Sequence, residues 1–188
     1  KEKKKKRKII IAAVLISIIF NGIYVFANTS DEESPENVAV ALVIDNSGSM
    51  ATTDPQNLRQ TAANIFIDLL SPDDYLSVIT FNTEEEVIVP INQVKNVENK
   101  SNIKKILSSN IEAIDNTDYL DALKVAKEQL SSLEDGEVRK VILFLTDGEP
   151  MPDIQREYDY EFMNGYMKSL WETVSDLSLN KTIFTFCR

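Results

Sequence analysis

An apolar run that ends in a cluster of oxygen side chains is the sequence feature that most constrains the fold. Val38 to Ile44 is apolar throughout, and the polar stretch Asp45 to Ser49 follows at once. A strand that is apolar at every position must be covered on both faces, which is typical of a parallel sheet wrapped by helices. A second run of this kind, Val141 to Leu145, ends at Thr146-Asp147-Gly148. The sequence therefore predicts an α/β fold with polar groups at the ends of two strands.

The segments between and after these runs alternate between helical and strand periodicity. The predicted elements are a helix beginning at Asp54-Pro55 with proline at its first position, a hairpin of strands Tyr75 to Phe81 and Val87 to Ile91, helices at Asn102 to Ser109, Leu120 to Leu130 and Glu157 to Leu179, and a last strand at Thr182 to Phe186. This order predicts a Rossmann-like, doubly wound, mostly parallel sheet with one antiparallel edge strand and helices on both faces. Such sheets bind ligands at the carboxyl ends of their strands, where the strand order reverses.

The first residues of the chain have the pattern of an export signal. Lys1 to Lys8 is basic apart from one glutamate, Ile9 to Phe20 is apolar apart from Ser17, and Asn21-Gly22 interrupts the run. We therefore expect residues 1–27 to be a signal peptide or, if uncleaved, a membrane anchor. Residues 28–37 are expected to form a polar linker, and 38–188 the folded domain. The expected location is the extracellular side of the cytoplasmic membrane, the cell surface or the secreted fraction, in a bacterial cell-envelope setting.

The composition excludes several classes of function. The whole chain carries a net charge of −10, and the part after the basic head is more acidic still, so nucleic-acid binding is not expected. The chain has no histidine and one cysteine, Cys187. Serine-histidine catalysis, histidine-ligated zinc sites and disulfide scaffolds are therefore excluded.

The polar stretch after the first strand contains three oxygen ligands at alternate positions. In an extended loop the side chains of Asp45, Ser47 and Ser49 would point the same way. One carboxylate and two hydroxyls form a hard-oxygen set that suits Mg²⁺, Mn²⁺ or Ca²⁺. Asp, Ser and Gly after a strand are also ordinary turn and helix-cap residues, so the triplet alone leaves both interpretations open.

Two further positions complete a pattern that resembles a known family. Asp147 follows the second apolar strand, and Thr117 lies in the polar segment DNTDYLDAL. With Asp45-Asn46-Ser47-Gly48-Ser49, these residues resemble the metal-ion-dependent adhesion site of von Willebrand factor A domains, the fold shared with integrin inserted domains. That site has the pattern Asp-x-Ser-x-Ser, then Thr, then Asp in Thr-Asp-Gly. The resemblance covers about Val38 to Phe186 and implies a domain that is incomplete at its C-terminal end, because members usually continue into another helix and strand.

The resemblance implies a metal site and a binding mechanism. Its ligands would be Asp45, Ser47, Ser49, Thr117 and Asp147. The two serines would bind the cation directly, the two aspartates mainly through water, and the threonine in either way. Mg²⁺ is the expected cation, with Mn²⁺ or Ca²⁺ as alternatives. Because neutral hydroxyls leave the cation poorly neutralised, an open position would accept a carboxylate from a partner protein.

Neighbouring residues allow two interpretations each. Asp118 is either an additional oxygen near the metal or the N-cap of the following helix, and the cap is favoured. Met151, Tyr158 and Tyr160 are either a rim for partner contact or ordinary structural residues, with neither favoured. The residues expected to be the buried face of the long helix are Tyr166, Met167, Leu170 and Trp171.

The function predicted from these observations is a non-enzymatic, exported or membrane-tethered module that engages a protein ligand through a divalent cation. An assembly or sensor subunit that docks through the same metal site is the alternative. A Mg²⁺-dependent phosphohydrolase with Asp45 as nucleophile is disfavoured, because such enzymes usually carry a second aspartate where this chain has Ser47.

Overall fold

The computed structural model describes residues 37–114, 116–134, 138–148, 150–157, 159–179 and 183–187. The predicted signal peptide or anchor, and all of the predicted linker except Asn37, lie outside these residues. Within the described part of the chain, every helix is too short or too polar to cross a membrane.

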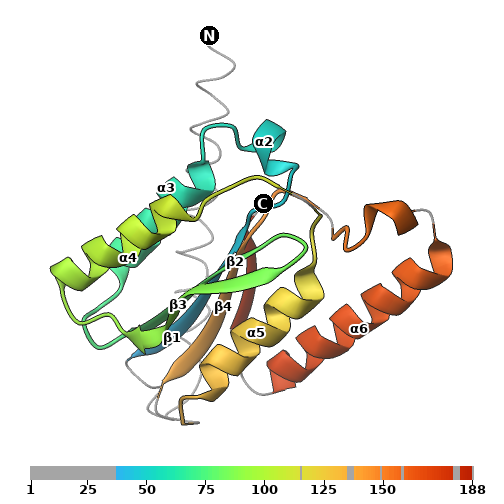
Figure 1. Cartoon of the computed structure of the whole chain (residues 1–188). Coiled ribbons are helices and arrows are strands. Elements are labelled where there is room, and N and C mark those ends of the chain that lie inside the picture. The colour runs from blue at the N-terminus through green and yellow to red at the C-terminus, as the bar shows by residue number, and fades with distance from the viewer. Residues whose placement is uncertain are drawn as a thin grey trace, which may run out of the picture. The chain divides into compact units, whose positions relative to one another are not determined.

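Five strands form one sheet in the order β3-β2-β1-β4-β5 (Figure 1). The strands are β1 (Val38–Asp45), β2 (Tyr75–Phe81), β3 (Glu85–Gln93), β4 (Arg139–Leu145) and β5 (Ile183–Cys187). β1 pairs in parallel with β2 and β4, β4 pairs in parallel with β5, and β3 pairs antiparallel with β2 at the edge. The predicted fold class is confirmed. The chain first adds strands on one side of β1 and then on the other, so the strand order reverses beside β1.

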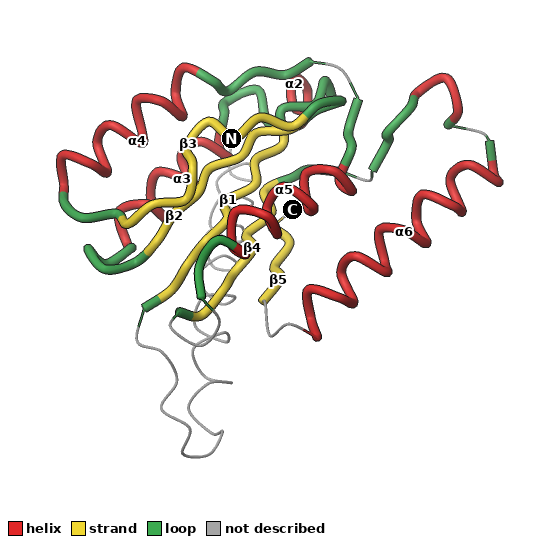
Figure 2. The backbone as a smooth tube through the Cα atoms, turned by 60° about the horizontal axis from the view of Figure 1, so that its bottom comes forward, coloured by secondary structure: helices red, strands yellow, loops and turns green. Residues whose placement is uncertain are grey.

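Helices cover both faces of this sheet (Figure 2). They are α2 (Met50–Thr53), α3 (Leu58–Leu69), α4 (Val97–Ser109), α5 (Tyr119–Ser131), the short 3₁₀ helix η1 (Ile154–Arg156) and α6 (Tyr160–Leu179). α3 and α4 lie on one face, and α5 and α6 lie on the other.

Each face of β1 contributes to a separate core. Ala39, Ala41 and Val43 pack in the cluster that contains the buried side chains of α5, whereas Val40, Leu42 and Ile44 pack in the cluster of α3 and α4. Successive side chains of a strand alternate between faces, so both cores draw on the apolar residues of this one strand. This burial on two sides explains why the strand is apolar at every position before Asp45.

Three predicted helix boundaries are wrong. Pro55 is not the first helical residue: α3 begins at Leu58, and the Asp54 carboxylate reaches forward to accept hydrogen bonds from the backbone N–H groups of Leu58 at 2.6 Å and Arg59 at 3.0 Å. α4 begins five residues earlier than predicted, because Asn96 caps it. α6 begins at Tyr160 rather than Glu157.

One core assignment is also wrong. Trp171 is 64% exposed on α6, whereas Tyr166 on the same helix is 9% exposed. The buried face of α6 is therefore narrower than the spacing of its apolar residues predicted, and the Trp171 side chain lies outside it.

Candidate metal centre

The candidate residues lie at the edge of the sheet where β1, β2 and β4 end. Asp45 is the last residue of β1 and is paired with Phe81, the last residue of β2. Ile44 is paired with Leu145, the last residue of β4, so Asp147 follows the neighbouring strand by two residues. The parallel register therefore brings two segments that are about a hundred residues apart to one edge (Figure 1).

Asp45 is fully buried and held by two donors. Its Oδ1 accepts a hydrogen bond from the Ser47 N–H at 2.7 Å, and its Oδ2 accepts one from the Thr146 hydroxyl at 2.5 Å. Burial raises the pKa of the Asp45 carboxyl, the hydrogen bonds from Ser47 and Thr146 oppose the rise, and the nearby charge of Asp147 adds to it. The net effect is a raised pKa, so ionisation of Asp45 is less favourable here than in a solvent-exposed aspartate.

Ser47, Ser49 and Asp147 form a continuous cluster with one another. The two serine Oγ atoms are 3.2 Å apart, and the Ser49 hydroxyl donates to Asp147 Oδ1 at 3.1 Å. Thr53, at the end of α2, donates its hydroxyl to Asp147 Oδ2. Because Ser47 also donates its backbone N–H to Asp45, hydrogen bonds join four of the five predicted ligands.

These side chains do not converge through the extended loop that the sequence predicted. The segment is not extended: Ser49 has helical backbone angles (φ −57°, ψ −32°) and precedes α2, and the Met50 N–H bonds to the Ser47 carbonyl at 3.1 Å. A turn that leads into a four-residue helix brings the hydroxyls together, and α2 was not predicted.

Thr117 lies at the same edge but is held by its backbone. Its N–H and carbonyl each form a 2.9 Å hydrogen bond with Met151, four residues after Asp147. The residue is buried, with 7% of its surface exposed. Among the described residues, no hydrogen bond joins its hydroxyl to the other four candidates.

Asp118 is the N-cap of α5, as favoured from the sequence. Its carboxylate accepts hydrogen bonds from the N–H groups of Leu120 at 2.9 Å and Asp121 at 3.5 Å. It therefore faces the first turn of the helix, and the interpretation as an additional metal ligand is not supported.

Two residues that the sequence reasoning missed support Asp45 from behind. The Thr146 hydroxyl that donates to Asp45 is also 2.7 Å from the Tyr119 hydroxyl. The Tyr119 hydroxyl donates a hydrogen bond to the Gly148 carbonyl at 2.8 Å. Thr146 could have been suspected from its place beside Asp147. Nothing in the local sequence pointed to Tyr119, because its ring also belongs to the core, where it packs on Phe81 and Phe144.

Asn46, between two predicted ligands, holds the segment that leads to Thr117. Its Nδ2 donates to the Asn110 carbonyl at 2.7 Å, and its own carbonyl accepts from the Ile114 N–H at 2.8 Å. The buried Arg59 adds a third bond, from Nη2 to the Glu112 carbonyl at 2.6 Å. The motif position written as x therefore has a structural role here.

The residues of the proposed rim are only partly described. Met151 is half-buried and paired with Thr117, and Tyr160 is 80% exposed at the start of α6. Tyr158 lies outside the described residues.

The donor set fits a hard divalent cation. The described residues contain no cluster of three or more His, Cys, Asp or Glu side chains that could hold a metal, so a cation at this edge would depend on hydroxyl oxygens as much as on the two carboxylates. Oxygen-only ligands of this type suit Mg²⁺, Mn²⁺ and Ca²⁺ rather than zinc or copper.

Comparison with known proteins identifies the family. Residues 40–149 match the family model of the von Willebrand factor type A domain. Human inter-alpha-trypsin inhibitor heavy chain H4 is 35% identical over 140 residues, which are 70% of this chain and 14% of that protein, so the chain spans a small part of this relative.

Solved structures show the same fold at low sequence identity. Proximal thread matrix protein 1 from the mussel byssus matches with a TM-score of 0.60 and 19% identity, over 81% of this chain and 36% of that chain. A pilus adhesin from Lactobacillus rhamnosus GG matches with a TM-score of 0.51 and 21% identity, over 65% and 16% of the two chains. The chain belongs to the von Willebrand factor type A domain family.

Proposed function

We propose that this domain binds a divalent cation, Mg²⁺ first and Mn²⁺ or Ca²⁺ as alternatives, at Asp45, Ser47, Ser49, Thr117 and Asp147. The observation that carries the proposal is the hydrogen-bonded cluster at the ends of β1 and β4: side-chain bonds join Ser47, Ser49 and Asp147, and the Ser47 backbone N–H joins them to the Asp45 carboxylate. A buried carboxylate with a raised pKa beside a second carboxylate is a place where a cation relieves unfavourable charge.

The cation would engage a protein ligand that presents a carboxylate. Hydroxyl ligands carry no charge, so a divalent ion bound by the serines and Thr117 keeps much of its positive charge and an affinity for an anionic oxygen. Asp45 and Asp147 would hold bound water and orient the hydroxyls. Similarity to a pilus adhesin supports a role in protein contact or adhesion.

We infer binding rather than catalysis at this site. Asp45 is fully buried and each of its oxygens already accepts a hydrogen bond, which disfavours its approach to a phosphoryl group as a nucleophile. The proposed location, outside the cytoplasmic membrane, rests on the basic and apolar pattern of residues 1–27, and the pilus relative agrees with it.

Calorimetric titration of Mg²⁺, Mn²⁺ and Ca²⁺ into the protein tests the cation site. We expect saturable binding that Ser47→Ala and Asp147→Ala abolish. Ser108→Ala is the matched control, because this exposed serine on α4 bonds only to the Lys105 carbonyl of its own helix among the described residues. Absence of binding by the folded wild type would overturn the proposal.

A second titration tests the carboxylate ligand. A short peptide with one aspartate or glutamate, and the same peptide with the matching amide residue in that place, are each titrated into the protein. Each titration is run with Mg²⁺ and again with a chelator. We expect binding only with Mg²⁺ and only by the acidic peptide. Equal binding of the amide-bearing peptide would contradict a carboxylate-to-metal contact.

A further inference from the structure

The hydroxyl of Tyr166 fastens α6 to the first turn of α5. It accepts hydrogen bonds from the backbone N–H groups of Tyr119 at 2.8 Å and Leu120 at 3.1 Å, and donates to Asp118 Oδ1 at 2.9 Å. Burial and the adjacent Asp118 charge raise the pKa of this phenol, so it stays a neutral donor. One side-chain oxygen from α6 thus satisfies helix-end groups of another element.

This oxygen lies next to two separate supports of the candidate metal centre. Asp118 directly follows Thr117, and its N–H is fixed to the Asn82 carbonyl at 2.8 Å. Tyr119, whose backbone Tyr166 holds, extends its own hydroxyl to Thr146, which donates to Asp45. A hydrogen-bonded path therefore runs from α6 to a buried ligand on one side, and to the neighbour of Thr117 on the other.

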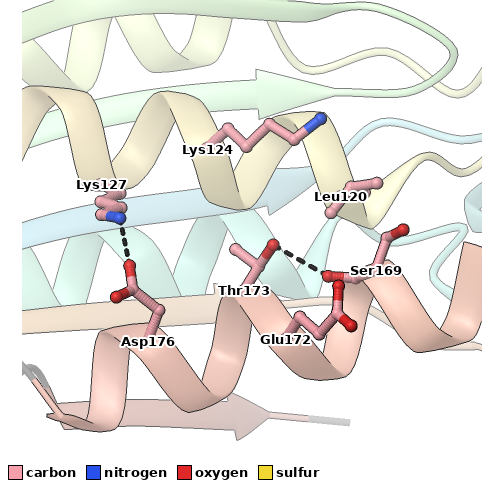
Figure 3. Close-up of a pocket in the computed structure, with 7 residues that line it drawn as sticks. All are labelled: Leu120, Lys124, Lys127, Ser169, Glu172, Thr173 and Asp176. Atoms are coloured by element: carbon pink, nitrogen blue, oxygen red, sulfur yellow. Dashed lines mark hydrogen bonds and ion pairs between the residues drawn. The ribbon is translucent and has the colours of Figure 1, made fainter.

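The rest of the contact between α5 and α6 is less complete. A hollow of about 410 Å³ lies between the two helices, lined by Leu120, Lys124, Lys127, Ser169, Glu172, Thr173 and Asp176 (Figure 3). Lys127 and Asp176 form an ion pair across it, between side chains that are 42% and 50% exposed. An exposed pair of this kind contributes little, so Tyr166 is the stronger polar link between the helices.

We propose that Tyr166 is a positioning residue that couples the docking of α6 to the cation affinity of the candidate metal centre, an inference that rests on the proposed function. When α6 is docked, the Tyr166 hydroxyl holds Asp118 and Tyr119, and through them Thr117 and Asp45, in the arrangement that the cation requires. Coupling of this type is reciprocal, so the bound cation also stabilises the docked position of α6.

The first test compares Mg²⁺ affinities by calorimetry. Tyr166→Phe keeps the ring in the core and removes only the hydroxyl, and we expect it to weaken Mg²⁺ binding about tenfold, within the usual range for coupled sites. Lys127→Met, which removes the ion pair across the hollow, is the matched control and should change the affinity less than about twofold. Equal affinities in wild type and Tyr166→Phe would overturn the inference, as would an equal loss in Lys127→Met.

The second test can overturn the inference with the wild type alone. Amide hydrogen exchange is measured in the wild type with and without Mg²⁺, and we expect the first turns of α6 to be slowed more than α4, which lies on the opposite face of the sheet. In Tyr166→Phe the difference between the two helices should disappear. Uniform slowing of both helices in the wild type would count against the coupling.

The two proposals fail in different ways. A wild type that binds no cation removes the proposed function and this inference with it. A wild type that binds Mg²⁺, with an unchanged affinity in Tyr166→Phe, removes only the role of Tyr166.

Discussion

At the scale of single residues, the candidate centre combines groups that are individually unfavourable in a fold. Asp45 is a fully buried carboxyl whose pKa is raised chiefly by burial. Asn46 and Arg59, both 6% exposed, each keep one buried polar atom, Oδ1 and Nε, without a partner among the described residues. Such costs concentrate where a fold serves a binding function.

Asp45→Asn is expected to stabilise the cation-free protein at neutral pH. Because the pKa of Asp45 is above 3.8 in the folded state, the folded protein binds more protons than the unfolded chain in the range just above pH 3.8. Proton binding at Asp45 therefore stabilises the folded protein at low pH, and this stabilisation is lost as the pH rises and Asp45 ionises. The amide side chain in the Asp45→Asn variant carries no charge at low or neutral pH and avoids the loss. Urea unfolding in a chelating buffer at pH 4 and pH 7 measures it.

The same variant separates stability from binding. The advantage of Asp45→Asn over the wild type should be larger at pH 7 than at pH 4, while Mg²⁺ binding is lost. A variant that is less stable than the wild type at pH 7 would show that the ionised carboxylate stabilises the fold, contrary to this account.

Arg59→Met is expected to destabilise the protein by about 3 kcal/mol, the usual cost of breaking a buried ion pair. The Arg59 Nη1 atom lies 3.0 Å from Asp54 Oδ2, and the two side chains are 4% and 11% exposed. Chemical denaturation measures the change. Lys124→Met removes the exposed pair with Asp121 and should cost less than about 0.5 kcal/mol, so similar losses in the two variants would contradict the argument from burial.

At the scale of elements, the first residue of a helix is set by side-chain hydrogen bonds to its free N–H groups, and apolar periodicity does not reveal them. The boundaries of α3, α4 and α6 were wrong because the groups that set them, Asp54, Asn96 and Asp159, act over three to five residues by side-chain hydrogen bonds. α2 has four residues, too few to show a period. The exposure of Trp171 depends on which neighbours cover the helix, which spacing alone does not contain.

Asp118→Ala should cost more than Asn96→Ala, although both residues are N-caps. Loss of a cap costs about 1 kcal/mol, which is the expected effect for Asn96 at the start of α4. Asp118 also accepts the Tyr166 hydroxyl, so its removal should cost about 2 kcal/mol. Thermal and urea unfolding of both variants give the comparison, and equal costs would mean that the bond to Tyr166 adds nothing.

At the scale of the whole molecule, most of the fold could be predicted and the centre only in part. The apolar runs at β1 and β4, the hairpin and the helical spacings predicted the sheet with its antiparallel edge, because alternation and burial are local signals. Asp45, Ser47, Ser49 and Asp147 were brought together as expected. Thr146 and Tyr119 were missed, because their contacts depend on strand register and on packing between distant segments.

Mg²⁺ should stabilise the whole fold, since an ion that binds only the native state shifts the unfolding equilibrium. At a concentration about 100 times the dissociation constant, we expect the free energy of unfolding to rise by about 2.7 kcal/mol. Calorimetric melting with increasing Mg²⁺ measures this shift. Ser47→Ala should show no shift, and a rise equal to that of the wild type would place the stabilising ion elsewhere.

The β3 edge of the sheet has a consequence for the behaviour of the protein at high concentration. Glu85, Glu86 and Pro90 are exposed on this outer strand. A proline offers no N–H to an incoming strand, and the glutamates of two copies would repel each other. We therefore expect this side of the molecule to resist strand exchange and fibril growth, and to keep crowded copies apart.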